Sequence, residues 1–151
     1  MASTDPAPEQ RRNILIVDDE PENIEVLAAA LGTEYEVFFA ISGDEAIELT
    51  SSQRIDLILL DIMMPEVDGY EVCRLLKLDP ELAEIPVIFV TAKTDTKDEA
   101  QGFAVGGVDY ITKPIKRLIV RARVNTHLQL KASLERLRAL ADVDGVAGMP
   151  S

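Results

Sequence analysis

The feature that most constrains the fold of this chain is a short, mostly apolar run that ends in an acid. Residues 55–60 are apolar apart from Asp56, and Asp61 follows them directly. A strand of this composition is usually buried on both faces, as strands of parallel sheets are. Open α/β sheets carry their chemistry at the carboxyl ends of such strands. Asp61 is therefore a candidate reactive residue.

Three further apolar runs also end in polar groups. These ends are Asp18 and Asp19 after residues 14–17, Thr91 after 87–90, and Lys113 with Pro114 after 108–112. Taken singly, each has a simpler explanation as a helix start, a turn residue, a cap or a strand terminator. Taken together, they bring acids, a hydroxyl and an ammonium to one edge, which the separate explanations do not account for.

Helical and strand patterns alternate along the chain. Strands are expected at residues 14–17, 36–40, 55–61, 87–91 and 108–112. Helices are expected before Gly32, from Ser42 onwards, at 69–78, at 97–105 and from about Ile115. Crossover helices of about ten residues return each strand to the same direction, which favours parallel pairing. The sequence therefore predicts an α/β fold with a doubly wound, five-stranded parallel sheet and five helices.

The length of 151 residues suits one domain with flanking segments. Residues 1–12 are polar and contain proline, so we expect a disordered tail. We expect the domain at residues 13–130 and a helical linker with a loose C-terminal tail at 131–151.

The last predicted helix is longer than a compact domain needs. If it spans residues 116–140, it is about 37 Å long at roughly 1.5 Å per residue, so its distal half protrudes. Leu130, Leu134, Leu137 and Ala141 have the spacing of a coiled-coil seam over about two heptads. This pattern predicts a homodimer. A frayed amphipathic tail is the alternative.

Composition excludes several kinds of partner. Asp and Glu number 27 against 15 Lys and Arg, a formal charge of −12 that repels nucleic acids and anionic lipid. We therefore expect no direct nucleic-acid or membrane binding. Cys73 is the single cysteine and lies among apolar residues, so we expect a small buried hydrophobe. A secretory signal and a membrane-length apolar run are absent from the sequence, which favours a cytoplasmic location.

Four motifs together resemble the receiver domain of two-component response regulators. They are Val-Asp-Asp-Glu-Pro at 17–21, Leu-Asp-Ile-Met-Met-Pro at 60–65 with Asp-Gly at 68–69, Val-Thr-Ala-Lys at 90–93, and Asp-Tyr-Ile-Thr-Lys-Pro at 109–114. All occur in order and with family-like separations. The resemblance covers about residues 13–130 and implies a flavodoxin-like sheet with strand order 2-1-3-4-5.

The resemblance implies that Asp61 accepts a phosphoryl group from a phosphohistidine on a sensor histidine kinase or phosphotransfer protein. It also implies that Mg²⁺ is held by Asp18, Asp19, Asp61 and the backbone carbonyl of Met63. Elementary electrostatics agrees, because carboxylates in one pocket repel one another unless a cation compensates. Magnesium suits such oxygen ligands.

The remaining site residues also take their roles from the resemblance. Thr91 and Lys113 would bind phosphoryl oxygens, and the amide of Ala92 would donate to another. Tyr110 would be a switch residue that moves as Thr91 moves, and Pro114 would follow a cis peptide bond. The alternative for Tyr110 is a half-buried strand tyrosine with its hydroxyl in water.

Two other classes of protein share parts of this pattern. A dehalogenase-like phosphatase also uses an aspartate at a strand end with Mg²⁺, but it needs an acid two residues later, where this chain has Met63. A phosphorylation-independent adaptor would keep the fold without needing the acids. We therefore expect a phosphoacceptor that catalyses only its own phosphorylation and dephosphorylation.

Residues 137–150 resemble the lead-in to GGDEF-type diguanylate cyclase domains, although Val146, Ala147 and Met149 depart from that pattern. We interpret the chain as a receiver domain with a linker, and no cyclase chemistry can reside in it. His127, the single histidine, is expected at a packed or solvated helix position. The cognate kinase, the stimulus and the output do not follow from the sequence.

Overall fold

The computed structural model describes residues 11–92 and 96–148, which form five strands and five helices. The strands are β1 (Asn13–Val17), β2 (Glu36–Ala40), β3 (Leu57–Asp61), β4 (Val87–Thr91) and β5 (Asp109–Thr112). The helices are α1 (Pro21–Leu31), α2 (Gly43–Ser52), α3 (Gly69–Leu78), α4 (Thr96–Ala104) and α5 (Arg117–Gly148).

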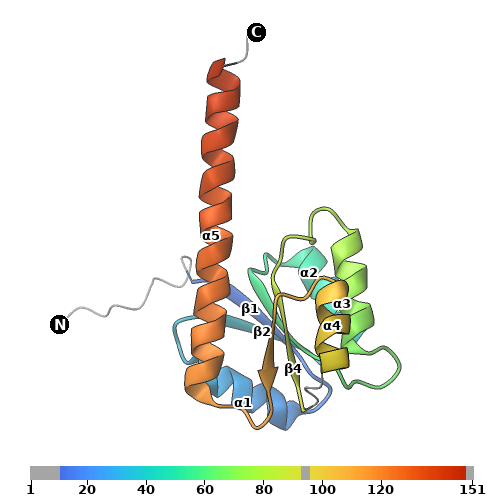
Figure 1. The fold of residues 1–151 in the computed structure, drawn as a ribbon. Helices are drawn as coiled ribbons and strands as arrows, with labels where there is room; N and C mark the ends of the chain where they lie inside the picture. The colour runs from blue at the N-terminus through green and yellow to red at the C-terminus, as the bar shows by residue number, and fades with distance from the viewer. Residues whose placement is uncertain (1–10, 93–95, 149–151) are drawn as a thin grey trace, which may run out of the picture.

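All neighbouring strands pair in parallel, in the order β2-β1-β3-β4-β5 (Figure 1). Val17 pairs with Leu60, and Asp61 pairs with Val90. This register brings the carboxyl ends of the central strands to one edge. The predicted doubly wound α/β fold with strand order 2-1-3-4-5 is confirmed.

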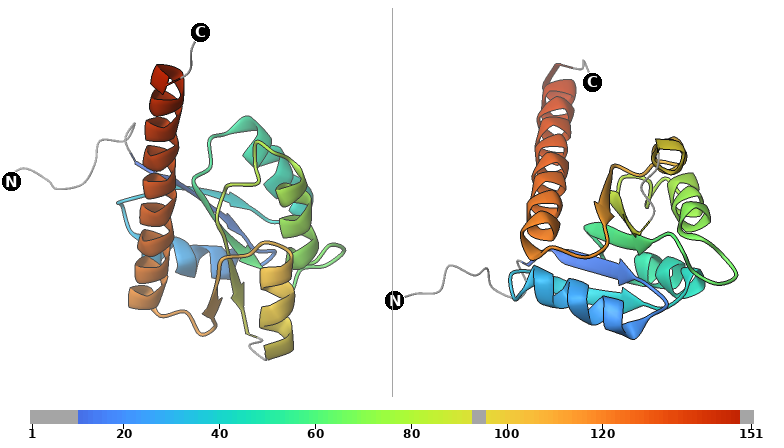
Figure 2. Two further views of the ribbon diagram at one scale, coloured as in Figure 1. Left: turned by 45° about the horizontal axis from the view of Figure 1, so that its top comes forward. Right: turned by 60° about the horizontal axis from the view of Figure 1, so that its bottom comes forward.

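Successive strand residues point to opposite faces of the sheet, and each face has its own apolar core. On one face, α1 and α5 pack on alternate residues of the strands, as the two views of Figure 2 show. On the other face, α2 and α3 pack on the intervening residues. Both cores contain fully buried strand residues, which explains why these strands are almost continuously apolar.

Local signals set the ends of the first three helices. Pro21 occupies the first turn of α1, and Gly32 ends that helix with a φ of 72°. The Ser42 side chain accepts from the amide of Glu45 at the start of α2, and Asp68 accepts from the amide of Glu71 at the start of α3. These caps fix where the chain leaves the sheet edge.

Several element bounds differ from the sequence-based expectation. The strand β3 begins at Leu57, because Ile55 and Asp56 form its lead-in. Helix α4 begins and ends one position earlier than expected, at Thr96 and Ala104. The carbonyl of Arg12, which we expected in the tail, accepts from the amide of Glu36, so this residue belongs to the domain. Of the expected tail at 1–12 and the linker and tail at 131–151, residues 1–10 and 149–151 lie outside the described residues.

Helix α5 is longer than expected and continues to Gly148. Its 32 residues span about 48 Å at 1.5 Å per residue. Val120, Val124 and Leu128 are buried against the sheet, whereas Leu130 and Leu134 are exposed. The distal half therefore projects beyond the sheet (Figures 1 and 2). Within the described part of the chain, we find no helix with the length and apolar character that a membrane span requires.

Candidate functional site

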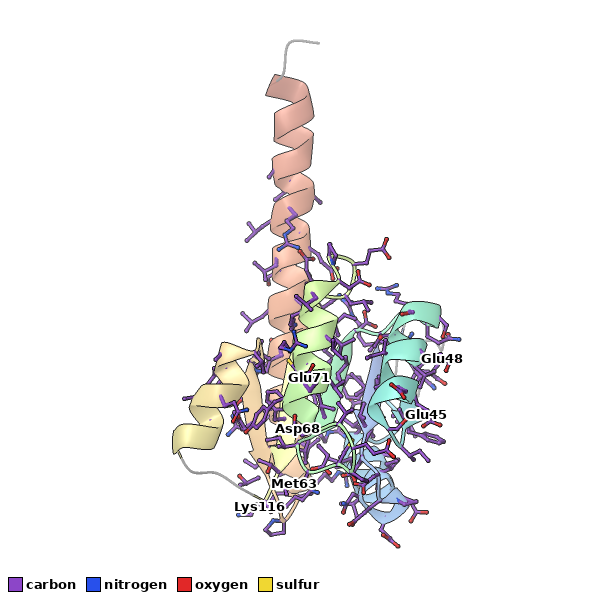
Figure 3. All side chains as sticks on the ribbon, turned by 90° about the vertical axis from the view of Figure 1, so that its right-hand side faces the viewer. Glu45, Glu48, Met63, Asp68, Glu71 and Lys116 are labelled. Carbon is purple, nitrogen blue, oxygen red and sulfur yellow. The ribbon has the colours of Figure 1, made fainter. Side chains whose placement is uncertain are left out.

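Three carboxylates meet at the carboxyl edge of the sheet. Asp18 and Asp19 follow β1, Asp61 ends β3, and one oxygen from each lies within 4.8 Å of the others. Asp18 and Asp61 are buried, and Asp19 is partly exposed. Figure 3 shows Met63 and Lys116 at this end of the molecule, while the distal half of α5 extends in the opposite direction. The site and the projecting helix thus lie at opposite ends of the sheet.

Lys113 places one ammonium between two of these acids. Its Nζ lies 3.6 Å from Asp18 Oδ2 and 3.6 Å from Asp61 Oδ1. The residue follows β5, its backbone amide donates to the carbonyl of Thr91, and the peptide bond to Pro114 is cis. One cation among three carboxylates leaves an excess of negative charge.

The charge excess is most evident at Asp61. The pKa of its carboxyl group is raised to about 6, first by burial and then by the nearby Asp18 carboxylate. Lys113 and the amide of Met63, which donates to Asp61 Oδ1 at 3.3 Å, lower the pKa and offset part of this effect. Asp61 therefore stays protonated to a higher pH than a free aspartate does, and a further cation would favour its charged form.

Asp18 has one oxygen that is satisfied by the chain and one that is not. Oδ1 accepts from the amide of Glu20 at 2.9 Å and from Asn23 Nδ2 at 3.4 Å. Oδ2 is buried and makes no hydrogen bond with the described residues, although Lys113 lies nearby. A buried carboxylate oxygen beside two further carboxylates fits a hard divalent cation. The residues present therefore fit Mg²⁺.

The other predicted site residues lie at the same edge. Thr91 is buried at the end of β4 and pairs with Thr112 of β5. Ala92 follows it and is exposed, and the side chain of Met63 is exposed after β3. The structure thus brings together residues from four separate strand ends. The ligand role of the Met63 carbonyl and the donor role of the Ala92 amide stay predictions.

Gly69 is needed for this edge, although the sequence indicated it only as a helix start and as part of a family motif. A Cβ atom on Gly69 would lie 2.3 Å from the carbonyl oxygen of Asp61. The Gly69 amide also donates to the carbonyl of Ile62 at 2.9 Å. The loop after β3 can therefore close tightly behind Asp61 only without a side chain at this position.

Tyr110 is buried, and its hydroxyl contacts other groups of the chain. Its ring packs against Phe89 and Phe103, with centroids 5.4 Å and 5.6 Å away. Its hydroxyl lies 3.4 Å from the Tyr70 hydroxyl and donates to the carbonyl of Glu99 on α4 at 3.4 Å. The alternative of a half-buried tyrosine with a solvated hydroxyl does not describe this state.

Gly102 makes room for this tyrosine. A Cβ atom on Gly102 would lie 1.9 Å from the Tyr110 hydroxyl oxygen, although the residue is in the interior of α4. Glycine inside a helix normally costs about 1 kcal/mol relative to alanine. An isolated glycine in a predicted helix was the signal that could have indicated this packing role.

The predicted seam and the two other singled-out residues lie away from the acids. Leu130, Leu134 and Leu137 are each more than half exposed, and the first two line a groove of about 630 Å³ beside the turn between α4 and β5. His127 lies at a packed position, with Nε2 3.0 Å from Asp109 Oδ2. Cys73 is fully buried, as predicted, and burial raises the pKa of its thiol to about 11.

We predict that Gly102→Ala displaces the Tyr110 ring, because the new methyl group and the hydroxyl cannot occupy the same space. The chain has three tyrosines, so fluorotyrosine labelling gives three fluorine resonances. The Tyr110 resonance should become accessible to a soluble paramagnetic agent in the variant. Ala100→Gly, at an exposed position of α4, is the control for changed helix propensity. A protected Tyr110 resonance in Gly102→Ala would contradict the packing role.

Comparison with known proteins agrees with this geometry. The family model of the response regulator receiver domain matches residues 14–125. A probable cyclic di-GMP phosphodiesterase of Vibrio cholerae is 47% identical over 124 residues, which are 82% of this chain and 28% of that protein. The response regulator PleD of Caulobacter vibrioides is 42% identical over 126 residues, 83% of this chain and 28% of that protein. The chain thus spans under a third of the length of either relative.

A solved structure shows the same likeness in three dimensions. The signal receiver domain of a signal transduction histidine kinase from Syntrophus aciditrophicus has a TM-score of 0.72 and 40% identity, covering 78% of this chain and 90% of that one. The residues matched by the family model include all four strand ends that build the acidic edge. The chain therefore belongs to the response regulator receiver domain family.

Proposed function

We propose that Asp61 is the phosphoacceptor of this receiver domain. The observation that carries the proposal is the convergence of Asp18, Asp19 and Lys113 on a buried Asp61. A carboxylate at this position is held against a cation and is close to two further acids that suit a metal. Such an arrangement serves phosphoryl transfer, which depends on positioning and charge neutralisation.

We propose that Mg²⁺ completes the site, held by Asp18, Asp19, Asp61 and the Met63 carbonyl. When bound, the ion neutralises charge on the acids and on the phosphoryl oxygens. The buried, unbonded oxygen of Asp18 supports this assignment. The ion would also lower the pKa of Asp61, because it favours the charged form of the carboxyl group.

The chain's own residues would perform the transfer. A carboxylate oxygen of Asp61 forms a bond to phosphorus while the bond from phosphorus to the donor imidazole nitrogen breaks. The imidazole keeps that electron pair and takes a proton from solvent. Lys113 would pair with one phosphoryl oxygen, and the Thr91 hydroxyl and Ala92 amide would donate to others. The product is an aspartyl phosphate.

We propose a sensor histidine kinase or phosphotransfer protein as the donor, which implies a cytoplasmic site. The membership of the receiver family supports this partner. A phosphatase of the dehalogenase type is disfavoured, because Met63 is where that chemistry needs its second acid. An adaptor that works without phosphate is disfavoured by the intact acidic set.

We predict that Asp61→Asn abolishes phosphoryl acceptance and leaves the fold intact, because an amide has a similar shape and is a poor nucleophile. Intact-protein mass spectrometry after acetyl phosphate and Mg²⁺ should show the added phosphate in the wild type alone. Asp44→Asn, which alters an exposed acid on α2, should label as the wild type does. If Asp61→Asn takes up as much phosphate as the wild type, Asp61 is not the phosphoacceptor. Hydrolysis of added phosphomonoesters would favour a phosphatase instead.

We also propose that phosphorylation acts through Thr91 and Tyr110. Thr91 would move towards the phosphoryl group, and Tyr110 would respond because its strand, β5, pairs with β4. The contact of the Tyr110 hydroxyl with the backbone of α4 supports this path. A change at the acidic edge would thereby reach α4 and the start of α5.

The output would pass along α5, with residues 13–130 as the domain and 131–151 as the linker. Leu130, Leu134, Leu137 and Ala141 form the proposed dimer seam, and all four side chains are exposed. The resemblance of residues 137–150 to a cyclase lead-in supports an output in cyclic di-GMP metabolism. The Vibrio cholerae relative, a probable cyclic di-GMP phosphodiesterase, supports the same class. The reading frame after Ser151 tests this output class.

We predict that beryllofluoride with Mg²⁺, which mimics the phosphoryl group, increases the dimer fraction or rearranges the dimer. A coupling of about 1.4 kcal/mol changes such an equilibrium roughly tenfold. Light scattering measures the change, and Leu134→Glu should suppress dimer formation. Leu118→Glu, at an exposed position before the seam, is the control. If the protein stays monomeric at high concentration with and without beryllofluoride, and Leu134→Glu changes nothing, the dimer seam is wrong. Helix α5 would then only connect the receiver domain to an output domain.

A further inference from the structure

The distal half of α5 is held to the domain by charge rather than by apolar packing. Val120, Val124 and Leu128 bury its first turns in the core. Beyond them, Lys131 is the next side chain that reaches a buried group of the sheet, and it is itself only 18% exposed. The helix leaves the domain from this point, so the contact at Lys131 is placed to set its direction.

The buried group is Asp56, in the segment that leads into β3. Its side chain is 2% exposed. Oδ2 accepts from the amide of Asn13 at 2.7 Å, and the Asp56 amide donates to the carbonyl of Asn13 at 2.8 Å. These two bonds extend the pairing of β1 and β3 and fix the carboxylate at the amino edge of the sheet.

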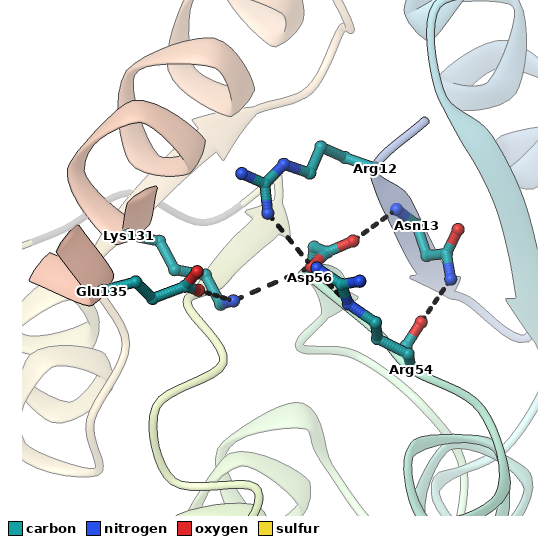
Figure 4. A network of polar contacts seen from close by, with 6 residues as sticks. All are labelled: Arg12, Asn13, Arg54, Asp56, Lys131 and Glu135. Atoms are coloured by element: carbon teal, nitrogen blue, oxygen red, sulfur yellow. Dashed lines mark hydrogen bonds and ion pairs between the residues drawn. The ribbon is translucent and has the colours of Figure 1, made fainter. Parts of the chain in front are cut away.

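Three cations surround the other oxygen of this carboxylate (Figure 4). Arg12, Arg54 and Lys131 lie 3.5 Å, 3.5 Å and 3.7 Å from Asp56 Oδ1, which makes no hydrogen bond with the described residues. Arg12 comes from the chain before β1, Arg54 from the turn after α2, and Lys131 from α5. Asp56 is therefore a buried carboxylate at which these three segments meet.

We propose that the Asp56–Lys131 ion pair is the anchor that fixes the direction in which α5 leaves the domain. A buried carboxylate is costly to leave without its cations, so it resists the loss of Lys131. A second ion pair joins the distal half of α5 to the rest of the domain, between Arg138 and Glu84. It is a weaker candidate because both side chains are more than half exposed. Exposed pairs of this kind contribute little.

The anchor has a structural connection to the acidic edge. Asp56 precedes β3, and Asp61 ends it, so the two acids stand at opposite ends of one fully buried strand. The leucines of the seam begin beside Lys131. The ion pair thereby holds the seam in one orientation relative to β3 in the unphosphorylated domain.

Electron spin resonance distances test the anchor on the unphosphorylated protein. One spin label is placed at Ser52→Cys on α2 and a second at Ala139→Cys on α5, both at exposed positions outside the seam. Cys73 is fully buried and does not compete for label. Labelled protein is diluted into unlabelled protein to remove distances between copies. Lys131→Gln should broaden or shift the distance distribution.

Two controls separate the anchor from general loss of charge. Arg54→Gln removes a cation from the same carboxylate without altering α5, and Glu135→Gln removes the partner of Lys131 within the helix. Both should keep the wild-type distribution. Circular dichroism checks that each variant is folded. An unchanged distribution in Lys131→Gln, or an equal change in Arg54→Gln, would overturn the proposal, and neither outcome bears on phosphoryl acceptance by Asp61.

Discussion

The parallel register of β1, β3 and β4 is the constraint on which the site depends. It aligns the ends of three buried strands, so the side chains of Asp18, Asp61 and Thr91 meet at one edge. Burial then makes the charge balance unfavourable, because Lys113 is the single cation that the described residues place between the acids. The cost is visible in the raised pKa of Asp61. The proposed Mg²⁺ would relieve this cost, and the phosphoryl group would then bring its negative charge to a neutralised pocket.

The two ends of the sheet carry different groups of charged residues. The carboxyl edge holds the acids, and the amino edge holds Asp56, which three cations surround. Helix α5 runs from the first edge past the second, and its apolar packing ends at Leu128. In the proposed function, this arrangement would separate the chemistry from the output by the length of β3. Coupling between the two ends would then depend on Tyr110, which contacts α4, and on the proposed anchor of α5.

Most of the fold could be predicted because its signals are local. Apolar runs gave the strands, and Ser42 and Gly32 marked helix ends within a residue or two. The acids were predictable because strand ends share an edge. By contrast, the packing of Gly102 on Tyr110 and the ion pair of Asp56 with Lys131 join residues distant in sequence. Neither has a local pattern. The continuation of α5 to Gly148 was also missed, because the apolar spacing that predicted this helix ends at Ala141.

The pH dependence of unfolding with and without Mg²⁺ tests the charge balance most directly. Without metal, the pKa of Asp61 is raised from 3.8 to about 6 in the folded state, so its contribution to stability is lost as pH rises through that range. In chelator, the free energy of unfolding of Asp61→Asn should therefore rise by about 3 kcal/mol relative to that of the wild type between pH 4 and pH 7. This follows from about 1.36 kcal/mol per unit of pKa shift. Millimolar Mg²⁺ should remove or reverse this gain. The account would be contradicted if the free energies of unfolding of the two proteins differed by the same amount at every pH in chelator, and if Mg²⁺ did not change that difference.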